Sequence, residues 1–179
     1  MKKTLLLIST LLFVGIAPTL SKEKNPTAPT NLELAGDSTR LAELDRYWAN
    51  VSQTVKDGDF EGYSATYHKD AVVIFATGEN KISHSIENAL ANWKQGFIDT
   101  KAGKKRDNVE FRFSQRIGSE TTAHETGIFY YTSFDSNNNQ KVKEFVHFEM
   151  LLIKRENGWI GLMEYQKSKA SQEEWDALK

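Results

Sequence analysis

The chain has 179 residues, of which 39% are hydrophobic and 26% charged, values that suit one soluble globular domain with flanking segments. Its formal net charge of −1, without any basic block, argues against nucleic-acid binding. There is no cysteine, which excludes disulfides, thiolate nucleophiles and cysteine-based metal sites.

The N-terminal segment has the pattern of a secretory signal peptide. Lys2 and Lys3 precede an apolar run at residues 5–16, and small residues follow as far as Ser21. Such a run is too short to span a bilayer, and the order positive, apolar, small is typical of a signal peptide. We therefore expect residues 1–21 to be removed and the mature protein to be exported, to the periplasm or the extracellular space. A retained membrane anchor is the alternative.

The following segment, residues 22–36, mixes Lys, Asn, Thr and Pro with little periodicity. All three prolines of the chain lie before residue 30. This composition predicts a linker, so the folded domain is expected to span residues 37–179.

Three helices are expected in the first half of this domain. The first begins at an N-cap, Asp37 or Ser38, and ends at Gly58, and the third begins at Ser83 or Ser85. Each carries apolar side chains at helical spacing. These are Leu41, Leu44, Tyr47, Trp48, Val51 and Val55 in the first helix, Phe60, Tyr63 and Tyr67 in the second, and Ile86, Leu90, Trp93 and Phe97 in the third.

The second half is predicted to consist of strands. Alternating and β-branched patterns mark strands at residues 71–75, 109–117, 121–134, 141–154 and 159–166. Arg155–Gly158 has the composition of a hairpin turn, and a short helix containing Trp175 follows the last strand. Helices followed by successive strands predict an α+β domain, in which a cone-shaped, curved antiparallel sheet wraps around about three N-terminal helices.

Several motifs resemble those of the nuclear transport factor 2-like superfamily. They are Tyr47-Trp48, Gly58-Asp59-Phe60, Tyr67, Asp70-Ala71-Val72-Val73 and the final hairpin with Asn157-Gly158-Trp159. That superfamily includes ketosteroid isomerases, SnoaL-like polyketide cyclases and many secreted domains of unknown function. The resemblance covers roughly residues 38–168. It implies the cone-shaped fold, but it implies no single activity.

The resemblance also implies where catalytic groups of a ketosteroid isomerase would lie. That family uses a tyrosine on the first helix, a carboxylate base on the first strand and a protonated aspartate on the penultimate strand. At the matching positions this chain has Val51, Phe75 and Met150. Proton abstraction needs a base of suitable pKa, so we expect no ketosteroid isomerisation and assign no catalytic residue.

The same alignment predicts the lining of an interior pocket. If Met150 points inward and the turn places Lys154 opposite Trp159, alternation decides which side chains of the last hairpin face inward. The expected ligand-binding residues are aromatic or thioether side chains: Tyr63, Tyr67, Phe75, Trp93, Phe97, Phe148, Met150, Met163 and Tyr165. They favour a small apolar or aromatic ligand, with tyrosine hydroxyls as polar contacts; a filled core is the alternative.

The opposite face of the sheet is expected to carry charge. In this register Glu149 lies opposite Glu164 on the outer face, with His147 alongside. Directly opposed like charges are unfavourable, so compensating groups are expected, most simply at a homodimer interface. An acid/base or metal site is the alternative. The four histidines are scattered, however, and predict no metal centre.

Together these patterns favour an exported small-molecule-binding domain with an apolar, aromatic-lined pocket, no assured catalysis and no cofactor. One alternative is a SnoaL-like lyase or isomerase acting on an activated carbonyl compound. Another is a dimeric structural or interaction module. Neither nucleic acid nor, after signal cleavage, a membrane is expected as a partner.

Overall fold

The computed structural model describes residues 31–178, with the side chains of residues 37–178. The prediction for residues 1–21 lies outside this part of the chain. The elements are α1 (Asn31–Asp57), α2 (Phe60–Ser64), β1 (Tyr67–Phe75), β2 (Ile82–Ser85), α3 (Ile86–Lys101), β3 (Lys105–Gly118), β4 (Thr122–Asp135), β5 (Gln140–Arg155), β6 (Gly158–Lys169) and α4 (Gln172–Ala177). Within residues 31–178, no helix combines the length and apolar character needed to cross a bilayer.

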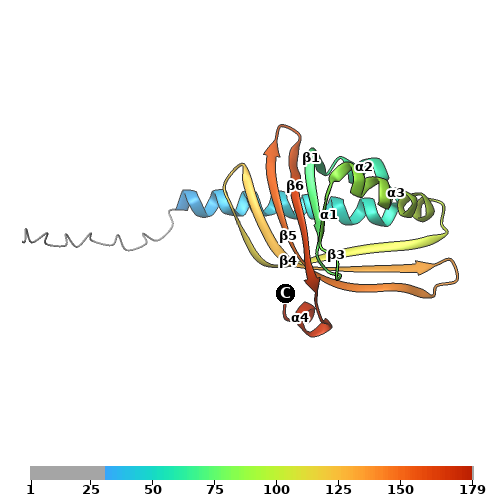
Figure 1. Cartoon of the computed structure of the whole chain (residues 1–179). Coiled ribbons are helices and arrows are strands. Elements are labelled where there is room, and N and C mark those ends of the chain that lie inside the picture. The colour runs from blue at the N-terminus through green and yellow to red at the C-terminus, as the bar shows by residue number, and fades with distance from the viewer. Residues whose placement is uncertain (1–30, 179) are drawn as a thin grey trace, which may run out of the picture.

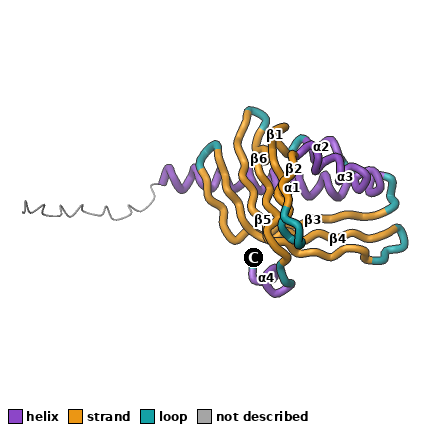
Figure 2. The backbone as a smooth tube through the Cα atoms, in the orientation of Figure 1, coloured by secondary structure: helices purple, strands orange, loops and turns teal. Residues whose placement is uncertain are grey.

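The six strands form one curved sheet in the order β2-β1-β6-β5-β4-β3. The sheet curves around α1, and α2 and α3 lie beside the C-terminal half of that helix (Figures 1 and 2). The predicted α+β architecture is therefore confirmed. One pair differs from the antiparallel expectation, since β1 and β6 run parallel. No hairpin joins these two strands, so the chain connection does not force them to run in opposite directions.

Helix α1 begins at Asn31, so the expected start at Asp37 or Ser38 is wrong. The end of the predicted linker, residues 31–36, belongs to the first turns of this helix. The last proline is Pro29, and only Gly36 within this stretch has a low helix propensity. One glycine costs about 1 kcal/mol, which the remaining turns of a long helix can offset.

The concave face of the sheet packs on α1. Leu44, Tyr47, Trp48 and Val51 are buried, at the i, i+3, i+4, i+7 spacing of one helix face. The predicted apolar stripe is thus confirmed. Tyr47, Trp48 and Val51 also line the cavity between this helix and the sheet.

The convex face is partly covered by α4, which lies on the opposite side of the sheet from α1 (Figure 1). The Trp175 ring lies 5.8 Å from that of Phe145 and 5.7 Å from that of Tyr130. The chain itself therefore covers these apolar residues of the convex face.

A β-bulge in β6 changes the register of the last hairpin. The predicted pairing next to the turn is confirmed, because Lys154 lies opposite Trp159. Further along, Leu162 is an extra residue in β6, and Met150 pairs with Glu164. An unbulged hairpin would have placed the preceding residue of β6 there.

A shift of one residue turns the side chains that follow to the other face of the sheet, here as far as Gln166, after which the register shifts again. Glu164 and Gln166 consequently face the concave side, where they line a cavity. Met163 and Tyr165 face the convex side. The predictions that Met163 and Tyr165 line the pocket, and that Glu164 lies on the outer face opposite Glu149, are therefore wrong for one reason.

A bulge in β3 likewise turns a cationic side chain toward the concave face. Phe113 pairs with Gly127, and Ser114 is the extra residue before normal pairing resumes. Arg116 then lies opposite Glu125 on the concave face. Each bulge thus brings one charged side chain into the interior.

Candidate functional site

A cavity of about 410 Å³ lies between the concave face of the sheet and helices α1, α2 and α3. Most of its wall is aromatic: Tyr47, Trp48, Tyr63, Tyr67, Phe75, Trp93, Phe97, Phe111, Phe129, Tyr131 and Phe148. Its polar side chains are Asn92, Lys105, Asp107, Glu144, Glu164 and Gln166. An apolar wall with a few convergent polar groups is the usual composition of a small-molecule site.

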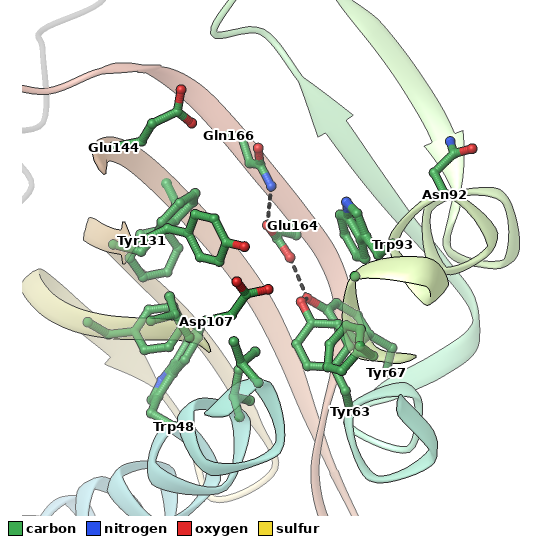
Figure 3. Close-up of a pocket in the computed structure, with 18 of the residues that line it drawn as sticks. Trp48, Tyr63, Tyr67, Asn92, Trp93, Asp107, Tyr131, Glu144, Glu164 and Gln166 are labelled. Atoms are coloured by element: carbon green, nitrogen blue, oxygen red, sulfur yellow. Dashed lines mark hydrogen bonds between the residues drawn. The ribbon is translucent and has the colours of Figure 1, made fainter. Parts of the chain in front are cut away.

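Glu164 is a buried acid in the wall of this cavity, and only 9% of it is exposed. Its Oε2 accepts a hydrogen bond from the Tyr67 hydroxyl, and its Oε1 accepts one of 2.7 Å from Gln166 Nε2 (Figure 3). The Tyr67 hydroxyl lies 3.2 Å from that of Tyr63. Burial raises the pKa of the Glu164 carboxyl, although both hydrogen bonds oppose this by favouring the charged form.

The hydroxyl groups of Tyr63 and Tyr67 stay protonated and can donate hydrogen bonds, because they are buried beside Glu164. Burial, followed by the negative charge of Glu164, raises the pKa of both Tyr63 and Tyr67. Within residues 37–178, no cationic side chain pairs with Glu164; its partners there are neutral.

A second carboxyl group enters the cavity from β3. Asp107 is 8% exposed, and its Oδ2 lies 2.6 Å from Lys105 Nζ. Its Oδ1 is buried and has no hydrogen-bond partner among the described residues. Burial, followed by the negative charge of Asp107, raises the pKa of the nearby Tyr131 hydroxyl. Figure 3 shows the carboxyl groups of Asp107 and Glu164 and the Tyr131 hydroxyl pointing into the same space.

A buried ion pair orients part of the aromatic wall. Trp48 Nε1 donates a 2.6 Å hydrogen bond to Oε2 of Glu125, which is 0% exposed. Arg116 Nε donates one of 2.8 Å to the other oxygen of this carboxylate. The Trp48 ring, held in this way, lies 4.4 Å from the ring of Phe111. The ion pair therefore acts on the cavity through the position of Trp48.

No family model and no curated protein matches this chain, but its fold matches solved structures. It is 14% identical to an NTF-2-like protein of unknown function from Shewanella oneidensis, with a TM-score of 0.55 over 72% of this chain and 98% of that one. A ketosteroid isomerase-like protein from Erwinia carotovora is 16% identical, with a TM-score of 0.53 over 74% and 97%. The chain has the nuclear transport factor 2-like fold.

A further structure with this nuclear transport factor 2-like fold, from Catenulispora acidiphila, is a complex with S-DNPA. That protein is 13% identical, with a TM-score of 0.54 over 71% of this chain and 91% of its own. Identities this low show the fold alone, since one fold serves many activities.

The nuclear transport factor 2-like cavity brings together most of the ligand-binding residues predicted from sequence: Tyr63, Tyr67, Phe75, Trp93, Phe97 and Phe148. Met150, in contrast, is 1% exposed and belongs to the core rather than to the cavity wall. Val51 and Phe75, at two positions compared with ketosteroid isomerase, do line the cavity as apolar side chains. The predicted apolar and aromatic lining, with tyrosine hydroxyls as polar contacts, nevertheless left out two acids of the wall, Asp107 and Glu164.

Two sequence signals could have revealed these acids. Asp107 lies two residues before Val109, so the alternation of that strand places both on one face. Glu164 requires the bulge, and a glycine inside a strand often marks one. At Gly161 a Cβ would lie 2.2 Å from the methyl group of Met150, so a larger residue there would force that side chain to move.

The charged groups of the convex face are compensated within the chain. Glu149 binds Lys167 at 2.6 Å and His124 at 3.2 Å, and hydrogen bonding from Lys167 lowers its pKa. His147 lies 3.2 Å from Glu174 of α4. Among the described residues, no group of three or more His, Asp or Glu could hold a metal ion. The homodimer stays a prediction, without the opposed glutamates that suggested it.

Proposed function

We propose that the cavity binds a small molecule with an aromatic or otherwise apolar body. The observation that carries this proposal is a volume of about 410 Å³ enclosed by an aromatic wall with a few inward-pointing polar groups. Small-molecule sites commonly span about 300–1,000 Å³ and combine apolar contact with a few orienting hydrogen bonds. Glu164 and Asp107 would supply the orienting contacts, and the rings of Tyr63, Trp93 and Phe97 the apolar ones.

A neutral, apolar dye tests this proposal. N-phenyl-1-naphthylamine fluoresces strongly in apolar surroundings, so wild-type protein is expected to give a saturable increase in its emission. Trp93→Ala removes part of the wall and should weaken binding by about tenfold, since burial of an aromatic ring contributes on the order of 1.5–3 kcal/mol. Trp175→Ala removes the same side chain from the convex face and should bind like the wild type. No emission change with the wild type would refute the proposal.

A second candidate function is proton transfer, in a lyase or isomerase acting on an activated carbonyl compound. It is favoured by one observation, a buried carboxyl group with a raised pKa that faces the cavity beside a tyrosine donor. Glu164 would take a proton from the carbon next to the carbonyl group, and Tyr67 or Tyr63 would donate to the carbonyl oxygen.

Hydrogen–deuterium exchange at that carbon separates the two candidates. Wild-type protein is incubated with a small ketone in deuterium oxide. NMR should show faster exchange of the hydrogen next to the carbonyl group than in a sample without protein only if a base of the protein removes it. The rate should rise with pH through the raised pKa of Glu164, because the base must be ionised, and Glu164→Gln should abolish it. Exchange that is unchanged in Glu164→Gln would exclude Glu164 as the base.

We also propose that the chain is exported, on the pattern of Lys2, Lys3 and the apolar run at residues 5–16. Intact-mass measurement of the periplasmic or secreted protein should show a species that lacks about the first 21 residues. A cytoplasmic species that retains Met1 as the sole form would contradict export.

A further inference from the structure

The charged groups of the cavity wall are unbalanced. Lys105 is the one cation among the described lining residues, and it already binds Asp107 Oδ2 at 2.6 Å. Glu164 receives hydrogen bonds from neutral groups alone. Glu144, an exposed residue whose Oε1 lies 3.8 Å from Lys169 Nζ, adds a further carboxylate to the wall. With these acids ionised, the lining carries a net negative charge that a ligand can neutralise.

The aromatic wall reinforces this preference. The Tyr63 ring lies 4.9 Å from that of Phe97 and 6.0 Å from that of Trp93, so these rings form a continuous surface beside Glu164. The faces of aromatic rings carry negative potential, and they attract cations more strongly where water is excluded. Neither the rings nor the acids favour an anionic ligand.

Asp107 also presents a buried acceptor atom that has no donor among the described residues. Only 8% of Asp107 is exposed, and its Oδ1 has no hydrogen-bond partner among residues 37–178. An unsatisfied buried acceptor costs free energy, and more so on a charged group. A neutral apolar ligand would leave this oxygen without a donor, whereas a ligand with several N–H groups would satisfy it.

We propose that the cavity takes a small organic cation, an amine with an aromatic or alkyl body, whose ammonium group donates hydrogen bonds to Glu164 and to Asp107 Oδ1. An ammonium group has up to three donors, and charge-assisted hydrogen bonds are stronger than neutral ones. The proposal rests on the proposed function, because it names the class of molecule that the same cavity binds.

Three ligands that share one ring system test the charge preference. Tryptamine is a cation near neutral pH, tryptophol is its neutral alcohol, and indole-3-acetate is an anion. Calorimetric titration of the full chain should give tryptamine an affinity about tenfold or more above that of tryptophol, because a charge-assisted bond replaces a neutral one. Indole-3-acetate should bind most weakly.

Matched variants locate the preference. Glu164→Gln should lower tryptamine affinity about tenfold while tryptophol affinity changes by no more than about twofold, because only the cation loses a charged partner. Asp107→Asn is a second variant with the same expected direction. Glu149→Gln removes a carboxylate from the convex face and should leave all three affinities unchanged, which separates local contact from net charge.

The outcomes distinguish this proposal from the one on which it rests. Equal affinities of the wild type for tryptamine and tryptophol would overturn the amine proposal and leave small-molecule binding intact. Failure of all three indoles, with the neutral dye still bound, would likewise overturn it alone. Failure of the indoles and the dye together would overturn both.

Discussion

Replacing Arg116 by alanine is expected to lower the free energy of unfolding by about 3–5 kcal/mol. The variant leaves the carboxylate of Glu125 fully buried, with the Trp48 indole N–H as its one remaining side-chain partner among the described residues. Removal of one member of a buried ion pair is costly because the other charge loses its compensation without gaining water. Urea unfolding followed by tryptophan fluorescence measures the loss.

Two further variants make this expectation specific to the buried partner. Asp45→Ala removes the other carboxylate bound to Arg116, but Asp45 is 63% exposed, so the loss should be at most about 1 kcal/mol. Glu125→Gln in the Arg116→Ala background removes the stranded charge and should restore much of the lost stability. A loss from Arg116→Ala no larger than the loss from Asp45→Ala would show that the interior ion pair contributes little to stability.

Replacing Gly58 by alanine is expected to destabilise the fold by about 3 kcal/mol or more. Gly58 ends α1 with a φ of +64°, in the left-handed region that favours glycine. A Cβ there would lie 2.4 Å from Lys101 N and 2.5 Å from Phe97 O. These are backbone atoms of α3 and cannot rotate away, so α3 would have to move off α1.

Gly103 provides the matched control for this variant. Its φ of +71° is almost the same, but a Cβ there would meet nothing within 4 Å. Gly103→Ala should therefore show only the conformational cost, about 1–2 kcal/mol. The difference between the two variants in urea unfolding measures the packing of α3 against the end of α1. Equal losses would show that the two helices separate without cost.

The features predicted correctly from sequence depend on local interactions. Ser85 accepts a hydrogen bond from Asn88 N at 3.3 Å, so one of the two serines predicted to begin the third helix does cap it. The strands beside the last turn likewise pair as the turn composition implies. Interactions of this kind involve residues a few positions apart, so a single sequence contains the information.

The features predicted wrongly depend on packing between distant segments. The bulge at Leu162 occurs in a strand that pairs with β5 on one side and with β1 on the other, and the register of both pairs is irregular there. Alternation within β6 carries no information about that shift. The acid of the candidate site was therefore placed on the wrong face, although the aromatic residues contributed by the helices were placed correctly.

The extra residue at Leu162 also changes how this chain should be aligned with others of its fold. A relative whose last strand is regular would present its central cavity residue one position nearer to the turn. An alignment that runs through β6 without a gap would then match Met163 with that residue and assign Glu164 to the exterior. Comparison of cavity chemistry across the fold therefore requires a one-residue gap at Leu162. Without that gap, a conserved acid at this place would be scored as a hydrophobic substitution.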